Sequence, residues 1–254
     1  MMPVWLEAGT WGLIAACGLL IGALLGWFLH FSARAVAHVM AFGSGILIAA
    51  LSLDLVGHAL DDSGVAILDG LRVAGAFMAG AIIYSLINHR LNTPVARHRK
   101  RSVHQAPAQS NNGMAIAVGT LLDAIPESIA IGLMVASGGT LSLATLLAIF
   151  ISNVPEALSS TSGMRRAGRS GGFMLGLWAS MILLSGVFAI LGALLFGDAS
   201  PMVRALVSCV AAGGIFAMVV ETMIPEAFSE THELSGLVAA LGFVSAVLLQ
   251  LISG

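Results

Sequence analysis

Long apolar segments follow one another along this chain of 254 residues, and very little charge interrupts them. Charged residues make up 9% of the sequence and apolar residues 58%, whereas a soluble domain carries roughly 25% charged residues. So little charge cannot cover the surface of a water-soluble globule. A disordered chain and a nucleic-acid-binding protein are also excluded, because the first needs high charge and the second needs a basic face. The sequence therefore predicts a polytopic membrane protein.

The apolar runs favour helices over a membrane barrel, because they are continuous and do not alternate with polar residues. We predict an all-α fold that forms a single transmembrane domain over residues 1–254. Its eight predicted spans are about 9–31, 36–59, 71–89, 113–136, 140–163, 172–196, 202–226 and 234–253. The count of eight depends on a weakly marked break around 227–233, and without that break the chain would have seven spans.

The cationic residues are distributed unevenly among the loops. Nine of the eleven follow the first, third or fifth span, and only Arg72 and Arg204 lie on the other side. Since cytoplasmic loops carry the excess of Lys and Arg, we expect those three loops in the cytoplasm, the protein in the inner membrane and both termini on the outer side. The longest loop, about 90–112, contains His98 and His104. We expect a solvated cytoplasmic linker there, with a metal-capturing loop as the alternative.

Acidic residues inside the predicted spans are the most informative feature for function. Five lie well within spans and a sixth lies near the end of the seventh span: Asp54, Asp123, Glu127, Glu156, Glu221 and, last, Glu226. A carboxylate in the middle of a bilayer costs at least ~2.5–3.5 kcal/mol. No Lys or Arg lies in the fourth, fifth or seventh span to pair with these acids. Either some of them are protonated, or a cation from solution occupies a site among them.

A Pro-Glu pair recurs in three spans, each time after an apolar residue and before a small one. The three stretches are Ile125-Pro126-Glu127-Ser128, Val154-Pro155-Glu156-Ala157 and Ile224-Pro225-Glu226-Ala227. Proline inside a helix removes one backbone hydrogen bond and usually kinks the helix. In lipid such a break persists only where protein or a wet cavity satisfies the freed carbonyl. We therefore expect kinked fourth and fifth spans.

Spacing brings the polar residues of these two spans together. Asp123 and Glu127 are four residues apart and share one helix face, as do Ser152 and Glu156. A connection of about four residues makes the fourth and fifth spans antiparallel neighbours. We predict a central cation site between them, made by Asp123, Glu127, Asn153 and Glu156, at the depth where transporters hold their substrates. The alternative is a structural role, in which protonated acids form hydrogen bonds between helices.

The paired Pro-Glu motifs of residues 113–163 resemble those of the ZIP (Zrt/Irt-like protein) family of divalent metal transporters. That family typically carries His-Asn-x-Pro-Glu-Gly on its fourth span and a related His-x-x-Pro-Glu on its fifth. Eight spans, outward termini and a His-containing loop between the third and fourth spans are also similar. This chain departs from the family where it carries Asp123, Ala124 and Ser152 in place of His, Asn and His. With no acid in the sixth span either, the resemblance implies one oxygen-rich metal site and not a two-metal centre.

The resemblance implies a transporter that moves a divalent cation toward the cytoplasm. Zinc is the family default, and the carboxylate-rich site makes iron or manganese more plausible. The ion is the substrate, and we expect no prosthetic group; the partners are the ion and membrane lipid, and a homodimer is left open. A candidate pathway leads from Asp54 and His58 past the central site and Ser152 to Glu221 and Glu226.

Two other function classes are weighed against transport. We do not expect an enzyme: Thr231-His232-Glu233-Leu234 lacks the second His of an H-E-x-x-H metalloprotease motif, and the chain has no P-loop for ATP hydrolysis. A non-transporting or sensor homologue with a degenerate metal site stays open, because the His and Asn of the family motif are replaced.

Overall fold

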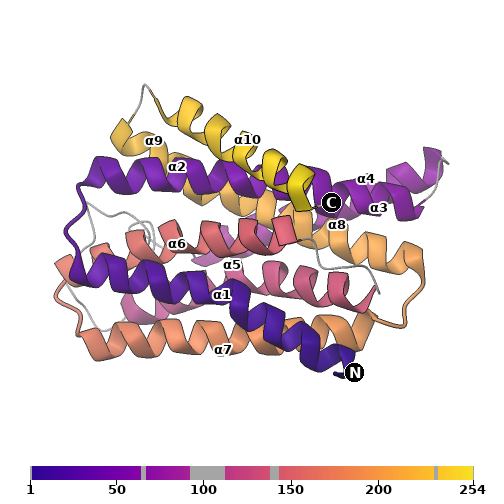
Figure 1. The fold of residues 1–254 in the computed structure, drawn as a ribbon, viewed down its shortest axis with the longest axis horizontal. Coiled ribbons are helices and arrows are strands. Elements are labelled where there is room, and N and C mark those ends of the chain that lie inside the picture. Colours follow the sequence, from indigo (N-terminus) through magenta and orange to yellow (C-terminus); the bar gives the residue numbers. More distant parts are fainter. Residues whose placement is uncertain (1, 64–66, 92–111, 138–142, 232–233, 254) are drawn as a thin grey trace.

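The computed structural model describes residues 2–63, 67–91, 112–137, 143–231 and 234–253, and every regular element in these ranges is helical. Figure 1 shows the helices running side by side along the long axis of the molecule, with both chain ends marked at the same end of the bundle. Six helices in the described ranges are long and apolar enough to cross a membrane. An all-helical, multi-pass membrane protein is therefore confirmed at this level.

The helices follow one another with few and short interruptions. In the first part of the chain they are α1 (Val4–Phe28), α2 (Ala33–Ala50), the π-helical segment η1 (Leu51–Val56), α3 (Gly57–Ser63) and α4 (Ile67–Leu91). In the second part they are α5 (Asn112–Ala136), α6 (Leu143–Arg166), α7 (Gly171–Phe196), α8 (Pro201–Met218), the π-helical segment η3 (Val219–Met223), α9 (Ile224–Thr231) and α10 (Ser235–Ser253). The α2–η1–α3 and α8–η3–α9 runs each form one long rod.

Local sequence explains where several helices begin. Ser32, Ser170 and Ser200 each accept a hydrogen bond from a backbone N–H at the start of α2, α7 and α8, which is the usual role of an N-cap serine. The first helix starts directly after Pro3 and ends at Phe28, so it begins and ends earlier than the expected span of 9–31. The cap at Ser32 starts the next helix too soon for the first to reach residue 31.

The weakly marked break around 227–233 is present. α9 ends at Thr231 and α10 begins at Ser235, and Figure 1 shows the chain reversing direction between them. Most of the loop expected at 90–112, including His98 and His104, lies outside the described residues.

Glycines allow the helices to pack backbone to backbone. A Cβ on Gly18 or Gly22 of α1 would lie 2.1 Å from the backbone oxygen of Phe150 or Val154 on α6. Real Cβ atoms do not approach that closely, so only glycine permits this contact. Close packing of this kind holds membrane helices together, because lipid supplies no hydrophobic driving force between them.

Helix contacts repeat between the two parts of the chain. α2 packs on α10 as α8 packs on α4, and α6 packs on α1 and α2 as α5 packs on α7 and α8. Glycines follow the same correspondence: Gly45 and Gly242 join α2 to α10, and Gly80 and Gly213 join α4 to α8. The three-helix units at the two ends of the chain thus enclose the central pair α5 and α6 in equivalent ways. Because an odd number of reversals separates them, the units run in opposite directions, as in the inverted repeats of many transporters.

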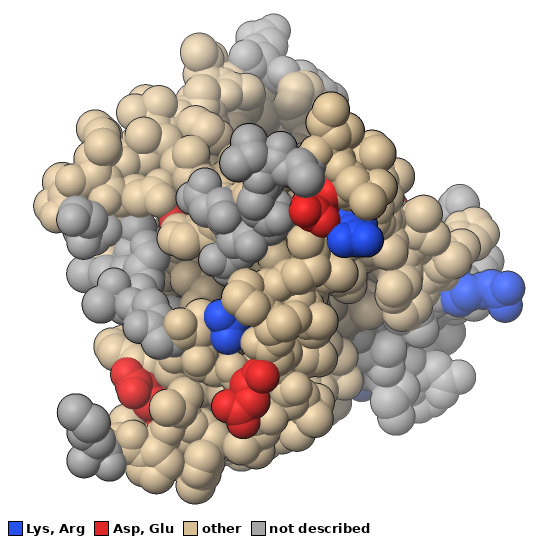
Figure 2. Space-filling model, turned by 90° about the vertical axis from the view of Figure 1, so that its right-hand side faces the viewer, with Lys and Arg blue, Asp and Glu red and all other residues tan. Residues whose placement is uncertain are grey.

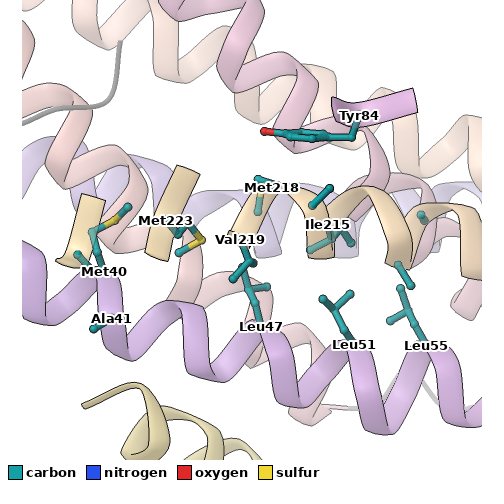
Figure 3. Packing of buried hydrophobic residues seen from close by; sticks show 14 of the residues in the cluster. Met40, Ala41, Leu47, Leu51, Leu55, Tyr84, Ile215, Met218, Val219 and Met223 are labelled. Carbon is teal, nitrogen blue, oxygen red and sulfur yellow. The ribbon is translucent and has the colours of Figure 1, made fainter. Parts of the chain in front are cut away.

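The two long rods meet in the largest apolar cluster of the molecule. Figure 3 shows Leu47 and Leu51 of the first rod opposite Ile215 and Val219 of the second. Tyr84 of α4 lies over the second rod in the same cluster. This packing sets the position of the polar residues described next.

Candidate functional site

The four residues of the expected central site all lie buried near the middle of their helices. Asp123 and Glu127 on α5 are 2% and 5% exposed, and Asn153 and Glu156 on α6 are 6% and 5% exposed. The two helices contribute to the same apolar clusters, since Ile131 of α5 packs with residues of α6. Carboxylates are therefore enclosed within an apolar interior, where burial without a partner is costly.

On α5, a neutral donor from a third helix holds the first acid. The hydroxyl of Tyr84 on α4 donates to Oδ1 of Asp123 at 2.7 Å, and both side chains are buried. One turn along the same helix, the ring of Pro126 lies 3.8 Å from the position of a Cβ on Gly214 of α8. The proline thus packs against a glycine of the second rod.

On α6, the expected ligands have partners within the protein. The amide of Asn153 donates to the backbone oxygen of Ala15 on α1 at 3.1 Å, and the hydroxyl of Ser152 donates to the backbone oxygen of Ile149 at 2.9 Å. Pro155 packs beside Gly43 of α2, which is the counterpart of the contact between Pro126 and Gly214. Both helices continue through their prolines, so their kinking stays a prediction.

The acids do not meet as a formed metal centre. Within the described ranges, no three side chains of His, Cys, Asp or Glu are grouped so as to hold a metal ion. The structure thus buries the expected ligands in the two central helices without gathering three acids around one point.

Asp54 lies toward the end of the bundle that holds the termini. Its carboxylate accepts hydrogen bonds from the hydroxyl of Thr145 on α6 and from the amide of Gln250 on α10. The residue is 3% exposed. His58, which is exposed, places its Nδ1 2.7 Å from the backbone oxygen of Asp54. The two residues expected at the start of the pathway are thus neighbours.

Glu221 and Glu226 lie toward the opposite end. The carboxylate of Glu221, which is exposed, accepts hydrogen bonds from the hydroxyl of Ser85 and, at 2.7 Å, from the amide of Asn88, both on α4. Glu226 is buried, and its carboxylate accepts a hydrogen bond from the hydroxyl of Ser159 on α6.

A line of buried polar side chains runs along α6 and connects the two ends. Its members, Thr145, Ser152, Glu156 and Ser159, are all at most 5% exposed. Steps of seven, four and three residues keep them on one helix face, and 14 residues of helix span roughly 21 Å. Thr145 bonds to Asp54 at one end of the line and Ser159 bonds to Glu226 at the other. We call these four residues the polar line of α6.

Sequence reasoning found the acids but missed their partners. Tyr84, Asn88 and Gln250 hold three of them, and two of these partners are amides inside apolar segments. An amide in a span was a signal that could have been used, because such groups are rare in lipid unless they have a partner.

No protein-family model matches this chain, and a search of curated proteins finds no match either.

Proposed function

We propose that this protein transports a divalent metal cation across the inner membrane toward the cytoplasm. Eight spans are proposed, with both termini outside, and the substrate is zinc, with iron or manganese as the alternatives. The polar line of α6 is the observation that carries the proposal. It joins Asp54, Glu156 and Glu226 through the protein interior, and buried carboxylates of this kind typically mark ion pathways in membranes.

The distribution of arginine supports the orientation. Arg34 begins α2, Arg90 lies in the last turn of α4, and Arg165 and Arg166 lie in the last turn of α6. All these helix ends lie opposite the chain termini, given the directions in which the helices run (Figure 1). Because cytoplasmic ends carry the excess of Lys and Arg, this end faces the cytoplasm in our proposal.

The chemistry of the polar line suits a hard or borderline cation. Carboxylate and hydroxyl oxygens are ligands for Mg²⁺, Mn²⁺ and Zn²⁺. Pro126 and Pro155 lack an N–H, so the carbonyls of Leu122 and Ile151 lose their usual helical partners. These carbonyls are further oxygen ligands beside Glu127 and Glu156, and the metal is the substrate of the protein.

Uptake into proteoliposomes tests the proposal. Purified protein is reconstituted, and the entry of Zn²⁺, Mn²⁺ or Fe²⁺ is followed with a metal-sensitive dye inside the vesicles. We expect saturable uptake that Glu156→Gln lowers at least about tenfold, the loss typical when a metal site loses a partner. The matched control is Glu7→Gln in the first turn of α1, far from the polar line, and it leaves uptake unchanged.

A non-transporting or sensor homologue is the second candidate function. The absence of a formed three-acid group within the described ranges favours it. The same assay separates the two, because folded protein that binds metal but gives no uptake over empty vesicles supports the sensor and removes the transporter.

A further inference from the structure

Two π-helical segments occupy equivalent places in the two long rods. η1 (Leu51–Val56) interrupts the first rod and η3 (Val219–Met223) interrupts the second, and each carries one acid, Asp54 or Glu221. Single π-helical turns inside α-helices are rare and occur often at functional sites. Because the rods are related by the repeat in the helix contacts, one segment lies toward each end of the bundle.

The surroundings of the two acids match in kind. Asp54 is bonded by a hydroxyl, from Thr145, and by an amide, from Gln250. Glu221 is likewise bonded by a hydroxyl, from Ser85, and by an amide, from Asn88. In each case the amide lies on the helix that packs along the rod, α10 against α2 and α4 against α8. The same chemistry is thus built at both ends from different helices.

We propose that these two clusters are peripheral divalent-cation sites, one made by Asp54, Thr145 and Gln250 and the other by Glu221, Ser85 and Asn88. Each offers a carboxylate, a hydroxyl oxygen and an amide, which are oxygen donors suited to Mg²⁺, Mn²⁺ or Ca²⁺. The amide that donates its N–H to the carboxylate exchanges that N–H for its carbonyl oxygen by a half-turn of its last bond. Each cluster then presents three kinds of oxygen to one ion.

A single acid in each cluster makes the site weak, and this suits an entry or exit point. An ion must bind well enough to enter a pathway and weakly enough to leave it. Within the proposed transport function, the Asp54 cluster receives the ion at the end with the termini, and the Glu221 cluster releases it at the opposite end. This role rests on the proposed function, whereas cation binding by the two clusters does not.

Paramagnetic NMR of threonine methyl groups tests binding without requiring transport. Thr145 belongs to the first cluster, and Thr222 lies next to Glu221 in η3. The solubilised full chain is labelled at threonine methyls and titrated with Mn²⁺, with Mg²⁺ as the diamagnetic reference. We expect Mn²⁺ to broaden both methyl signals, and to leave the signal of Thr10 at the start of α1 much less affected.

Two matched variants then separate the clusters. Asp54→Asn lowers the Mn²⁺ broadening of Thr145 about tenfold at subsaturating metal and leaves that of Thr222 unchanged. Glu221→Gln does the reverse. Gln250→Leu weakens the effect at Thr145, and Gln250→Glu restores or strengthens it, because a second carboxylate replaces the amide oxygen.

The result that overturns the inference is broadening that neither acid variant changes, or that both variants change at both methyls. Glu156→Gln serves as the control for the central site, and we expect it to leave both broadenings in place. Absence of uptake by the unmodified protein, with the methyl pattern as expected, would remove transport and leave the peripheral sites. Uptake without the methyl pattern would remove the peripheral sites alone.

Discussion

A buried carboxylate in an apolar helix bundle needs partners, and here those partners are neutral. Tyr84 donates to Asp123, Ser159 donates to Glu226, and Thr145 and Gln250 donate to Asp54. Hydroxyl and amide donors reduce the cost of burying an acid without neutralising it. The acids therefore keep their capacity to attract a cation.

The hydrogen bond from Tyr84 to Asp123 gives a prediction at this scale. Tyr84→Phe removes the donor and leaves the ring, so we expect it to lower the free energy of unfolding by about 1–2 kcal/mol. Thermal unfolding in detergent measures the change. Ser180→Ala is the control, because the hydroxyl of Ser180 bonds only within its own helix turn, to Leu177. Equal melting temperatures for Tyr84→Phe and Ser180→Ala would contradict the structural weight given to this bond.

Residue by residue, the sequence predicts acids better than it predicts their environment. Glu127 and Glu156 stand out because a charge in an apolar segment is conspicuous in one dimension. The donors come from α4, α6 and α10, which are far apart in the sequence, so only the fold reveals them. Asn153 illustrates the difference, since it was expected as a metal ligand and its amide donates to α1.

At the scale of elements, hydropathy predicts the helices and misses their irregularities. The expected seventh span, 202–226, corresponds to the rod from Pro201 to Thr231, because a long apolar run in lipid has to be helical. The π-helical segments η1 and η3 were not predicted. A π-turn depends on local hydrogen-bond register, and the apolar pattern around Asp54 does not encode that register.

Glycine packing between α1 and α6 gives the prediction at this scale. Gly22→Ala places a Cβ 2.1 Å from the backbone oxygen of Val154, so the helices must separate. We expect a loss of about 1–3 kcal/mol in the free energy of unfolding. Gly176→Ala on α7 is the matched control, because nothing lies within 4 Å of its Cβ. There we expect a gain of about 0.5–1 kcal/mol, and a loss at both positions would contradict the packing account.

The whole molecule is organised by its repeat and by its two unlike ends. The end that holds the termini carries both acidic and basic side chains on a mostly uncharged surface (Figure 2). At the opposite end, α4 and α6 finish in arginine and Glu226 lies buried. The repeat was suggested by the Pro-Glu motifs, but the matching of η1 with η3 required the packing of complete helices.

Cysteine labelling from one side of the membrane tests the orientation of the whole molecule. In a chain with Cys17→Ala and Cys209→Ala, single cysteines are placed at Ser200, between α7 and α8, or at Ser170, between α6 and α7. Both serines are exposed. An impermeant maleimide applied to intact spheroplasts is expected to label the first and to label the second only after permeabilisation. The reverse pattern would invert the proposed topology.

The central claim is that the acids of the middle helices hold a divalent cation, and anomalous diffraction tests it most directly. Crystals of the full chain soaked in Mn²⁺ or Zn²⁺ are measured at the absorption edge of the metal. We predict an anomalous peak between α5 and α6, about 2.0–2.2 Å from carboxylate oxygens of Asp123, Glu127 or Glu156, that is lost in Glu156→Gln. Metal peaks that avoid both helices, or a central peak unchanged in that variant, would contradict the claim.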